Sequence, residues 1–345
     1  MKEKVFVGLS GGVDSAVSAA LLKEAGYDVV GAFIKIWSPE FTECTWQEDR
    51  LDAMRVAAAL DIPFREVDLS HEYMQEIVSK MTDGYARGIT PNPDILCNRS
   101  IKFGHFAQWA FSHGAEKIAT GHYAQIMERD GRFELVRGAD PTKDQSYFLY
   151  QLTEKDLAHT LFPVGGLAKA HVRQLAEKYN LPVARKHDSQ GLCFVGDISL
   201  KDFLSRFIPL TQGDVSDMTG STIGTHDGAA LVTIGQRHGF AVQGKEPHYV
   251  VGIDVEKNLV HVSTHREDAA KKEAHLDDVT WIAQPRLPLH CSAQARYREQ
   301  PFPVTLDREA SGYRATFSDP HIVAPGQSLV LYDSDTCLGG GIINR

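Results

Sequence analysis

The stretch Val5-Phe6-Val7-Gly8-Leu9-Ser10-Gly11-Gly12-Val13-Asp14-Ser15 decides the fold of this chain. Its first five residues form a short apolar run, which is typical of a buried parallel strand. A glycine turn follows, and a segment with helical periodicity runs from Asp14 to about Ala25. Strand, turn and helix in this order bring backbone N–H groups and the positive end of a helix dipole to one point. The stretch therefore predicts an anion-binding loop.

The loop differs from a Walker loop, because no Gly-Lys-Ser/Thr follows its glycines. Gly11 and Gly12 allow a close backbone approach to phosphate oxygens, and Ser10 and Ser15 offer hydroxyl donors. A glycine-rich turn with an ordinary Ser/Asp helix cap is the alternative without a ligand.

The alternation of strands and helices continues beyond this loop. Strands are expected at 28–36, 64–69 and 116–120, and helices at 47–60, 72–86, 100–114, 154–160 and 170–179. This pattern predicts an α/β fold with a doubly wound parallel sheet over residues 1–207. A hairpin is expected from Ile126 to Val136 around Asp130-Gly131.

After residue 207 the chain is rich in glycines, turn pairs and short alternating runs, which are typical of β structure. A polar, lysine-containing stretch at 270–275 divides this region. We therefore expect two smaller domains after the sheet: a central mostly-β domain at 208–274 and a C-terminal β-barrel at 275–345. A length of 345 residues fits several hydrophobic cores better than one.

Bulk properties exclude some classes of protein. The net charge of −9 argues against a strongly cationic, non-specific nucleic-acid binder, but it permits an RNA recognised by shape or by a splayed base. Five cysteines, an odd number, occur without an export signal, which favours reduced thiols. No run approaches the roughly 18 apolar residues of a membrane span, so a cytoplasmic protein is expected.

Two cysteines lie in segments that suggest chemistry. Cys97 follows a loop rich in turn signals, Thr90 through Asn92-Pro93-Asp94, and precedes an expected helix, whose dipole would favour the thiolate. Asp94 has the right chemistry for a general base or for orienting a substrate. Cys193 lies in a glycine-containing polar segment at 188–196, which predicts a loop. The common alternative for a lone cysteine is a small buried apolar residue.

The run Ser10-Gly11-Gly12-Val13-Asp14-Ser15 resembles the PP-loop of the N-type ATP pyrophosphatases, a superfamily that includes several ligases and the tRNA thiolases. Both cysteine segments resemble those of the bacterial-type tRNA-specific 2-thiouridylases. Further segments resemble this family in the same order along the whole chain: Gly121-His122-Tyr123-Ala124, 143–148, 233–237 and 337–343.

The resemblance implies an enzyme that adenylates the C2 oxygen of the wobble uridine in tRNA with ATP and replaces this oxygen with sulfur from a cysteine persulfide. It implies Cys97 as a catalytic thiol, Asp94 beside it and Cys193 as the persulfide carrier. Both routes for the sulfur, direct attack or release as sulfide, end in a Cys97–Cys193 disulfide that a reductant must reopen. Asp94, Cys97 and Cys193 as ligands of an iron–sulfur cluster are the alternative.

The resemblance also assigns the binding residues. It implies an ATP site, with Mg²⁺ on the phosphates, at Gly8, Leu9, Ser10, Gly11, Gly12, Val13, Asp14, Ser15, Ile34 and Gly121. It implies contact with the target base at Asn92, Pro93 and Asp94, and contact with the rest of the tRNA at His122, Lys143, Asp144, Gln145, Arg296, Tyr297 and Gln327. One departure is visible, because Ile36 stands where the family commonly has an asparagine. A sulfur-donor protein, either a cysteine desulfurase or a persulfide relay protein, and a monomer bound to one tRNA are the implied partners.

The remaining candidates have modest interpretations. Cys44 is expected at a helix cap, and Cys291 and Cys337 as packing residues. No His-x-x-x-His pair falls on a helix, so no zinc site is predicted. A basic set before the Cys193 segment is either a solvated helix face or a surface for RNA phosphates: Lys169, His171, Arg173, Lys178, Arg185, Lys186 and His187. Arg296-Tyr297-Arg298 could likewise stack on RNA or be an ordinary strand with outward arginines.

Two other functions fit parts of the pattern. A PP-loop ligase acting on a small metabolite explains Ser10 to Ser15 equally well, but it gives no reason for two cysteine segments or for the β-rich region. An RNA-binding or sulfur-relay module with a degenerate nucleotide fold is the non-enzymatic alternative.

Overall fold

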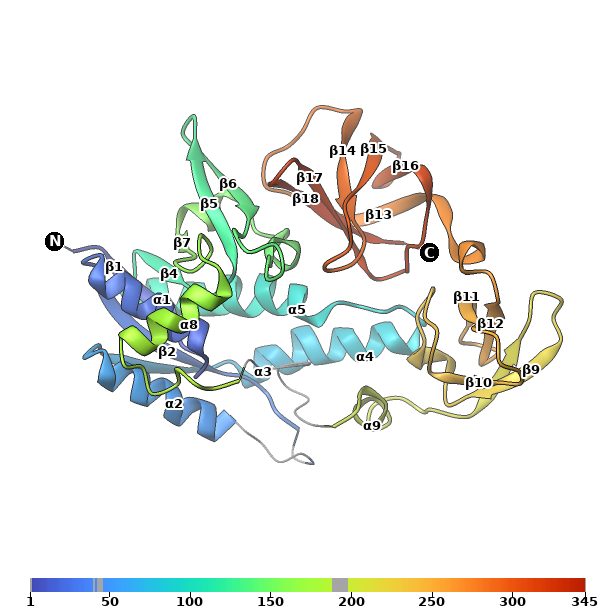
Figure 1. Ribbon diagram of the computed structural model, residues 1–345, viewed down its shortest axis with the longest axis horizontal. Coiled ribbons are helices and arrows are strands. Elements are labelled where there is room, and N and C mark those ends of the chain that lie inside the picture. The colour runs from blue at the N-terminus through green and yellow to red at the C-terminus, as the bar shows by residue number, and fades with distance from the viewer. Residues whose placement is uncertain (1, 40, 42–45, 188–197, 345) are drawn as a thin grey trace.

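The computed structural model describes residues 2–39, 41, 46–187 and 198–344. Cys44, Cys193 and the expected loop around Cys193 lie outside these residues. Figure 1 shows an α/β part and two β-rich parts spread along the long axis of the molecule, with helix α4 (Ser79–Ala86) running from the first toward the others. Within the described ranges, no helix combines the length and the apolar character that crossing a membrane requires.

The α/β part is built on a five-stranded parallel sheet in the order β3-β2-β1-β4-β7. Its strands are β1 (Lys4–Gly8), β2 (Asp28–Lys35), β3 (Phe64–Asp68), β4 (Lys117–Ala119) and β7 (Thr160–Leu161). Side chains of β1 alternate between two cores, because successive residues of a strand point to opposite faces. Val5 and Val7 pack in one core and Phe6 in the other. The predicted doubly wound sheet is confirmed.

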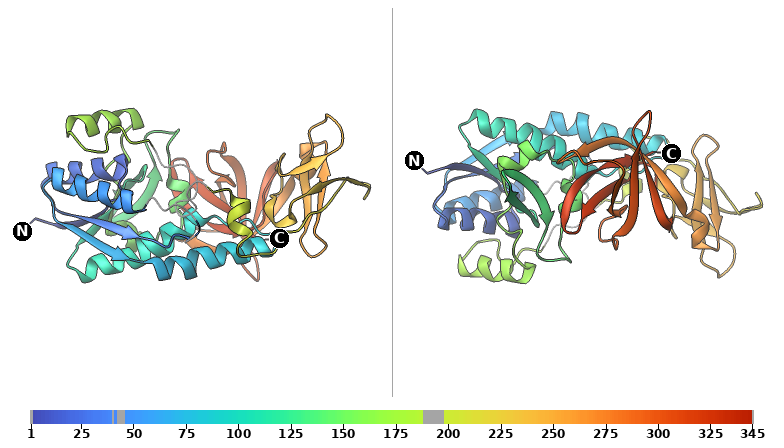
Figure 2. Two further views of the ribbon diagram at one scale, coloured as in Figure 1. Left: turned by 90° about the horizontal axis from the view of Figure 1, so that it is seen from below. Right: turned by 90° about the horizontal axis from the view of Figure 1, so that it is seen from above.

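Helices cover both faces of this sheet, as the two views of Figure 2 show. One face carries α1 (Val13–Glu24), α2 (Trp46–Ala59) and α8 (Lys169–Lys178). The other face carries two long helical segments, each containing a stretch of π-helix. The first consists of α3 (Ser70–Tyr73), η1 (Met74–Val78) and α4, and the second of α5 (Pro93–Leu96), η2 (Cys97–Phe106) and α6 (Ala107–Ser112).

The second segment begins earlier than the sequence predicts. We expected its helix at 100–114, but helical structure starts at Pro93. The side chain of Asn92 accepts hydrogen bonds from the N–H groups of Asp94 (3.2 Å) and Ile95 (3.3 Å), and proline fits the first helical position. An asparagine cap followed by proline thus starts a helix here, where we had expected a turn. The dipole of a helix acts most strongly within its first turn. Cys97 consequently lies beyond this region, inside the helical segment.

The expected hairpin is present as β5 (Ala124–Arg129) and β6 (Arg132–Arg137). Asp130 and Gly131 have φ values of 52° and 74°, the left-handed conformations that a two-residue hairpin turn requires. Strand β6 also pairs with β18, so the hairpin extends the C-terminal sheet. Two short helices, α7 (Glu154–Ala158) and α9 (Leu200–Leu204), and the 3₁₀ turn η3 (Ser146–Leu149) complete this half of the chain.

Both β-rich parts are antiparallel for the most part. The central sheet has the order β10-β9-β8-β12-β11 and contains β8 (Gly213–Ser216), β9 (Thr222–His226), β10 (Phe240–Val242), β11 (Tyr249–Asp254) and β12 (Leu259–Ser263). Two 3₁₀ turns, η4 (Ala229–Leu231) and η5 (Arg266–Ala269), flank its last three strands.

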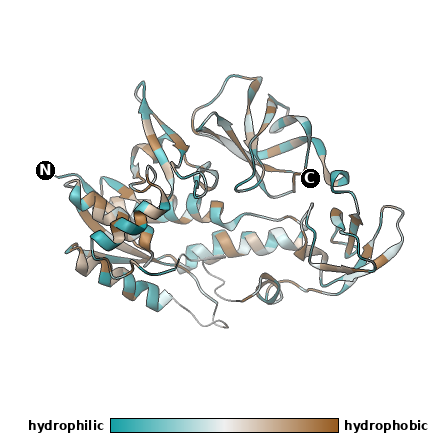
Figure 3. Cartoon of the chain, in the orientation of Figure 1, coloured by the Kyte–Doolittle hydropathy of each residue, from teal (hydrophilic) through white to brown (hydrophobic). Residues whose placement is uncertain are grey.

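The C-terminal sheet has six strands of its own: β13 (Lys271–Trp281), β14 (Leu289–Gln294), β15 (Phe302–Arg308), β16 (Tyr313–His321), β17 (Ser328–Asp333) and β18 (Thr336–Ile343). Strand β13 pairs with both β16 and β18, which closes these six strands into the expected barrel. The polar stretch at 270–275, expected as a separator, forms the start of β13. Apolar residues gather in the strands of the parallel sheet and of the barrel (Figure 3).

Candidate active site

The predicted anion-binding loop joins β1 to α1. Gly11 has a φ of +74°, and a Cβ atom there would lie 2.4 Å from the backbone oxygen of Asp49, so only glycine fits. Gly12 is the N-cap of α1 and has no side-chain cap, which leaves N–H groups of the first turn for a ligand. Ser15 is buried, and its hydroxyl donates to the carbonyl of Gly12 (3.1 Å), so it shapes the loop from inside.

Gly121 meets this loop from the neighbouring strand. It follows β4, and a Cβ atom on it would lie 2.7 Å from the nitrogen of Ser15. Strands β1 and β4 are adjacent, and the chain turns to opposite sides of the sheet from this pair, which is where open α/β sheets bind ligands. A Cβ on Gly8 would lie 3.8 Å from the Cδ1 atom of Ile34, at the end of β2. The structure therefore gathers Gly8, Ile34 and Gly121 around one crevice.

Asp14 has two partners that sequence reasoning missed. Its carboxylate accepts hydrogen bonds from the Tyr123 hydroxyl (2.7 Å) and from the Lys169 ammonium (2.7 and 2.9 Å). The Lys169 side chain is only 13% exposed. The sequence offered a weak signal for these residues, since Tyr123 follows Gly121-His122 and Lys169 belongs to the basic set. Asp14 is thus already neutralised by a cation of the protein.

This pairing bears on the expected magnesium ion. In the described part of the chain, no three His, Cys, Asp or Glu side chains converge as a metal site. Mg²⁺ typically keeps several waters and binds through one or two carboxylates and the phosphates of a nucleotide. One carboxylate beside a phosphate loop fits an ion that arrives on ATP and does not fit an all-protein site.

Asp94 and Cys97 lie three residues apart, on one side of the helical segment that starts at Pro93. Burial raises the pKa of the Asp94 carboxyl, and the positive charge of Lys102 acts in the opposite direction. Cys97 is 7% exposed and belongs to the core between this segment and the sheet. Asn98, the next residue, donates from Nδ2 to the carbonyl of Phe148 (2.9 Å), while its buried Oδ1 has no protein partner. The distance from Cys97 to Cys193 is not defined, because Cys193 lies outside the described residues.

His122 occupies a different place from the one expected. It is 8% exposed and its ring packs beside Phe103 and Phe162, so it does not present a surface to RNA. Burial, with the nearby charge of Lys102, lowers the pKa of His122 well below its usual range, so the ring is neutral. The Lys102 ammonium lies 3.4 Å from Nε2, and an ammonium can only donate. The proton of the ring is therefore on Nδ1, 2.7 Å from the hydroxyl of Thr120.

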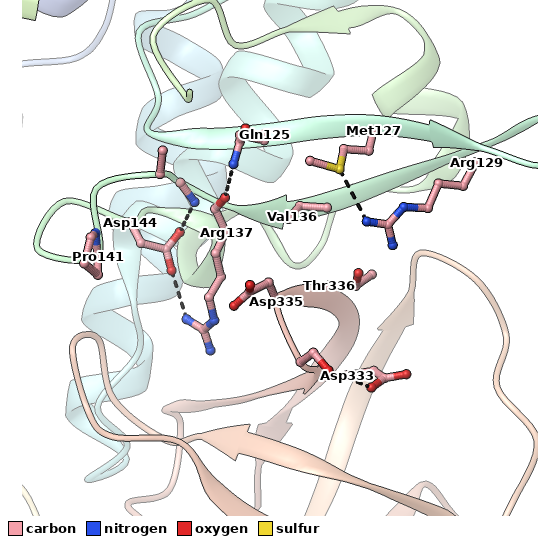
Figure 4. Close-up of a pocket in the computed structure, with 13 residues that line it drawn as sticks. Gln125, Met127, Arg129, Val136, Arg137, Pro141, Asp144, Asp333, Asp335 and Thr336 are labelled. Atoms are coloured by element: carbon pink, nitrogen blue, oxygen red, sulfur yellow. Dashed lines mark hydrogen bonds and ion pairs between the residues drawn. The ribbon is translucent and has the colours of Figure 1, made fainter. Parts of the chain in front are cut away.

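The loop at 143–145 contains a half-buried lysine and two residues that hold neighbouring segments together. Asp144 is buried, and its carboxylate binds Arg137 (2.9 Å) and the N–H groups of Gly138 and Ser146, as Figure 4 shows for Arg137. The expected RNA contact of Asp144 is therefore not available in this structure. Gln145 exchanges two hydrogen bonds with the backbone of Tyr123. Lys143 and Asp144 both line a surface cavity, and of these two Lys143 is the one that is not buried.

That cavity, of about 530 Å³, unites two of the expected RNA-binding segments. Lys143 lies on one side, and Tyr297 and Arg298 lie on the other. The Tyr297 ring packs 4.6 Å from the ring of Phe148, and the Arg298 guanidinium lies 5.0 Å from the Tyr297 ring centre. Aromatic rings flanked by cations suit stacked bases and phosphates.

Arg296 and Gln327, also expected to bind RNA, connect parts of the protein instead. Arg296 donates to the carbonyl of Ile234, between η4 and β10 of the central part (2.9 Å). Gln327 donates to the carbonyl of Thr90, two residues before the helix cap Asn92 (2.7 Å).

A second cavity, of about 630 Å³, lies between the β5–β6 hairpin and the turn that joins β17 to β18 (Figure 4). Arg129, Arg137, Asp333 and Asp335 are among its lining residues. None of the residues expected to bind ATP or the target base lines this cavity, so we do not assign it to the active site.

Lys169, Lys186 and Arg173 of the basic set are engaged within the protein. Lys169 binds Asp14, Lys186 binds both Asp49 and Asp52 (2.7 Å each), and Arg173 donates to the carbonyl of Ala184. This use corrects the idea of a continuous surface for RNA phosphates. The interpretation of Cys291 and Cys337 as packing residues is confirmed, since Cys337 belongs to a buried core and Cys291 packs against the core of the barrel. This burial raises the pKa of both thiols to about 12.

Comparisons with known proteins cover the whole chain. Residues 3–197 match the tRNA methyl transferase HUP domain, 201–264 the tRNA methyl transferase PRC-barrel domain, and 271–343 the aminomethyltransferase beta-barrel domain. The tRNA-specific 2-thiouridylase MnmA 2 of Geobacillus kaustophilus (strain HTA426) is 43% identical over 99% of this chain and 95% of its own. The tRNA-specific 2-thiouridylase MnmA of Nitrosomonas eutropha (strain DSM 101675 / C91 / Nm57) is 43% identical over 99% and 98%. A solved 4-thiouridine synthetase–RNA complex with bound ATP is 19% identical over 60% and 50%, with a TM-score of 0.39, which is too remote for a functional argument.

Proposed function

This chain belongs to the family of tRNA-specific 2-thiouridylases, and from this premise we propose how its side chains divide the reaction. The enzyme adenylates the C2 oxygen of the wobble uridine in tRNA and then replaces it with sulfur from a cysteine persulfide. The products are 2-thiouridine, AMP and pyrophosphate. The ATP step is needed because a uridine carbonyl is a weak electrophile whose oxygen is a poor leaving group.

The pyrophosphate end of ATP lies in the loop from Gly8 to Ser15. Supporting observations are the open N–H groups at the start of α1 and the absence of any side chain at Gly11 and Gly12, where phosphate oxygens approach. Ile34 and Gly121 flank the nucleoside at the same crevice. Mg²⁺ enters on the phosphates and offsets their charge.

The target base binds at Asn92, Pro93 and Asp94. Attack of the C2 oxygen on phosphorus is helped if the proton on N3 of the uracil is removed at the same time. Asp94 is suited to this task, because its raised pKa makes its carboxylate a stronger base than an ordinary aspartate.

Sulfur transfer uses Cys97 and Cys193. The terminal sulfur of the Cys193 persulfide forms a bond to C2, and AMP leaves with the C2 oxygen. The Cys97 thiolate then attacks the inner sulfur of Cys193, which forms the disulfide and releases 2-thiouridine. If Cys97 instead attacks the persulfide first, free sulfide reacts with C2 and the same disulfide results. A reductant reopens it in either case.

An iron–sulfur cluster on Asp94, Cys97 and Cys193 is the competing use of the same residues. Asp94 and Cys97 share one side of a helical segment, which suits two cluster ligands as well as a base and a thiol. An iron assay and an absorbance spectrum of anaerobically purified protein separate the two mechanisms, because a cluster absorbs in the visible range and a persulfide brings no iron.

The partners follow from the chemistry. A tRNA is the substrate, and one monomer serves one tRNA. A cysteine desulfurase or a persulfide relay protein loads Cys193, since the reaction consumes one sulfur atom per turnover.

The observation that carries this assignment is the closeness of two segments: the Gly8–Ser15 loop meets Gly121, and His122, beside Gly121, lies 3.4 Å from the ammonium of Lys102, whose charge acts on Asp94. A ligase for a small metabolite has no use for the second segment. Methyl transfer, which the names of two matched domains mention, needs no phosphate loop.

The test is mass spectrometry of tRNA nucleosides after incubation with ATP and a persulfide source. Wild-type protein should form 2-thiouridine, whereas Cys97→Ser and Cys193→Ser should form none and still bind tRNA. Cys291→Ser is the matched control, because that thiol lies in the barrel, and it should remain active. Normal turnover by either Cys97→Ser or Cys193→Ser would contradict the assignment.

A further inference from the structure

Lys102 lies on the same helical segment as Asp94 and Cys97. Neither proton removal by Asp94 nor sulfur transfer by Cys97 uses its ammonium. It follows Cys97 by five residues within η2, where the π-helical hydrogen bonds join residues five apart. Lys102 is therefore about one turn beyond Cys97 on the same side. Its charge reaches Asp94 in one direction and His122 in the other.

The ammonium of Lys102 is half-buried, and no ion pair among the described residues involves it. Its hydrogen-bond partner is the neutral ring of His122, which does not offset a positive charge. Lys169 and Lys186 are similarly withdrawn from water, and each has a carboxylate at 2.7 Å. Asp94, on which the charge of Lys102 acts, forms no direct ion pair with it, and withdrawing an ammonium from water without a directly paired carboxylate is unfavourable. An anionic ligand would supply the missing charge.

The position of Lys102 indicates which anion this is. His122 directly follows Gly121, whose backbone touches the first turn of α1 beside the phosphate loop. Lys102 thus lies between the loop proposed for the pyrophosphate and Asp94, proposed for the base. During adenylation the α-phosphorus passes from pyrophosphate to the C2 oxygen of the base. It must occupy the space between these two groups.

We propose that Lys102 is a further catalytic residue, whose ammonium binds the non-bridging oxygens of the α-phosphate of ATP during adenylation. A bond forms between the C2 oxygen and the α-phosphorus while the bond from that phosphorus to the β-phosphate oxygen breaks. The electron pair of the broken bond leaves with pyrophosphate, and the N3 proton of the base goes to Asp94. Lys102 stabilises the negative charge on the α-phosphoryl oxygens during this exchange and stays protonated. The proposal rests on the ATP and base positions given under the proposed function.

The test measures adenylation apart from sulfur transfer, as tRNA-dependent exchange of pyrophosphate into ATP with no sulfur source present. Lys102→Gln and Lys102→Met should slow this exchange by about 100-fold or more, the range found when one charge-stabilising donor is removed. Lys102→Arg keeps a cation and should lie between these variants and the wild type. Lys80→Gln, which removes an exposed lysine from α4, is the control and should exchange normally.

Lys102→Met distinguishes a catalytic role from a structural one. It replaces a poorly compensated ammonium with an apolar chain of similar length, so the free energy of unfolding without ligands should stay unchanged or rise while exchange is lost. A structural role predicts instead that the free energy of unfolding and the rate of exchange both decrease. The affinity for tRNA should change less than about threefold, since the ammonium is not on the surface that holds the tRNA body.

Two results would overturn the proposal: normal exchange by Lys102→Gln or Lys102→Met, and slow sulfur transfer with normal exchange. A wild-type protein without tRNA-dependent exchange would instead remove the proposed function itself.

Discussion

The hydroxyl of Thr90 lies 2.9 Å from the hydroxyl of Thr233, a residue 143 positions further along the chain. The other polar groups of Thr90 also bind distant segments: its N–H donates to the carbonyl of Pro325 (3.1 Å), and its carbonyl accepts from Gln327 (2.7 Å). Thr90 precedes Asn92 by two residues. The helix start that we propose to meet the target base is therefore held in place by the central β-rich part and by the C-terminal part of the chain.

Replacing Thr90 with valine removes the hydroxyl pair and retains the shape of the side chain. We expect a loss of about 1 kcal/mol in the free energy of unfolding, as for one hydrogen bond between partly buried groups. Single-turnover thiolation should slow, while the dissociation constant for tRNA stays the same. Denaturant titration and rapid-quench assays measure these quantities.

A double-mutant cycle identifies the pair as the cause. Thr233→Val should have the same effect as Thr90→Val, and the double variant should be no worse than either, because they remove one interaction. Thr90→Ser keeps the hydroxyl and serves as the control. Additive losses in the double variant would show that the two hydroxyls act independently.

Alanine at Gly11 should abolish ATP binding. The left-handed conformation costs about 1–2 kcal/mol for a residue with a Cβ, and the Cβ would also collide with the backbone of Asp49 at 2.4 Å. Gly26 is a matched control, because its φ is +92° and nothing lies within 4 Å of its Cβ position. Gly26→Ala should lose only the stability that corresponds to the left-handed conformation, and it should bind ATP normally. Calorimetric titration with ATP measures the binding of both variants. Equal binding by both would contradict the assignment of the Gly8–Ser15 loop to the phosphates.

Loss of the Lys169 ammonium should weaken ATP binding more than fold stability. In Lys169→Gln the Asp14 carboxylate loses its counter-charge beside the site for a triphosphate, and the two anions repel each other. We expect the KM for ATP to rise about tenfold, which corresponds to about 1.4 kcal/mol. Lys178→Gln is the control, because Lys178 lies on the same helix as Lys169 and its exposed ammonium lies 3.8 Å from Glu24 of α1. A KM that does not change would show that the pair serves α8 and not the nucleotide.

The pH dependence of adenylation should report Asp94. A base acts only when deprotonated, and burial raises the pKa of this carboxyl. The rate should therefore fall on the acid side at a pH above the usual range of aspartate. His122 should cause no further change in the adenylation rate near neutral pH, because its pKa is lowered well below its usual range. Pyrophosphate exchange measured across pH tests both statements.

The ionisation of Asp94 should affect stability in the opposite way from the adenylation rate: as pH rises, the rate increases and the free energy of unfolding decreases. A raised folded-state pKa means that the folded protein binds this proton more tightly than the unfolded chain, so the wild type loses stability as pH rises from the unfolded pKa through the folded one. Asp94→Asn lacks this loss and should be more stable than the wild type at pH 7, although it is inactive. Urea titrations of both proteins at acidic and neutral pH give the comparison. A variant less stable than the wild type at pH 7 would indicate that the carboxylate has a stabilising partner.

Local sequence determined the parts of this protein that depend on neighbouring residues. The run from Val5 to Ser15 specifies strand, glycine loop and helix, because a continuous apolar run and a glycine that permits positive φ act within a few residues. Asp130-Gly131 likewise sets the hairpin turn. The start of a helix at Pro93 was also encoded locally, by Asn92 and Pro93, but we had expected a turn from the same residues.

Tertiary structure alone decided what lies beside these elements. The pairs Asp14–Lys169 and Thr90–Thr233 join residues 155 and 143 positions apart, and no local pattern specifies which partner will meet which. Burial is equally non-local: His122 and Asp144 have the composition of surface contacts, but packing withdraws both from water. The half-buried position of Lys102 became visible only when the helix was placed against the sheet. Charge, protonation and accessibility depend on surroundings that the folded chain assembles from distant segments, and the chemistry of the site depends on them.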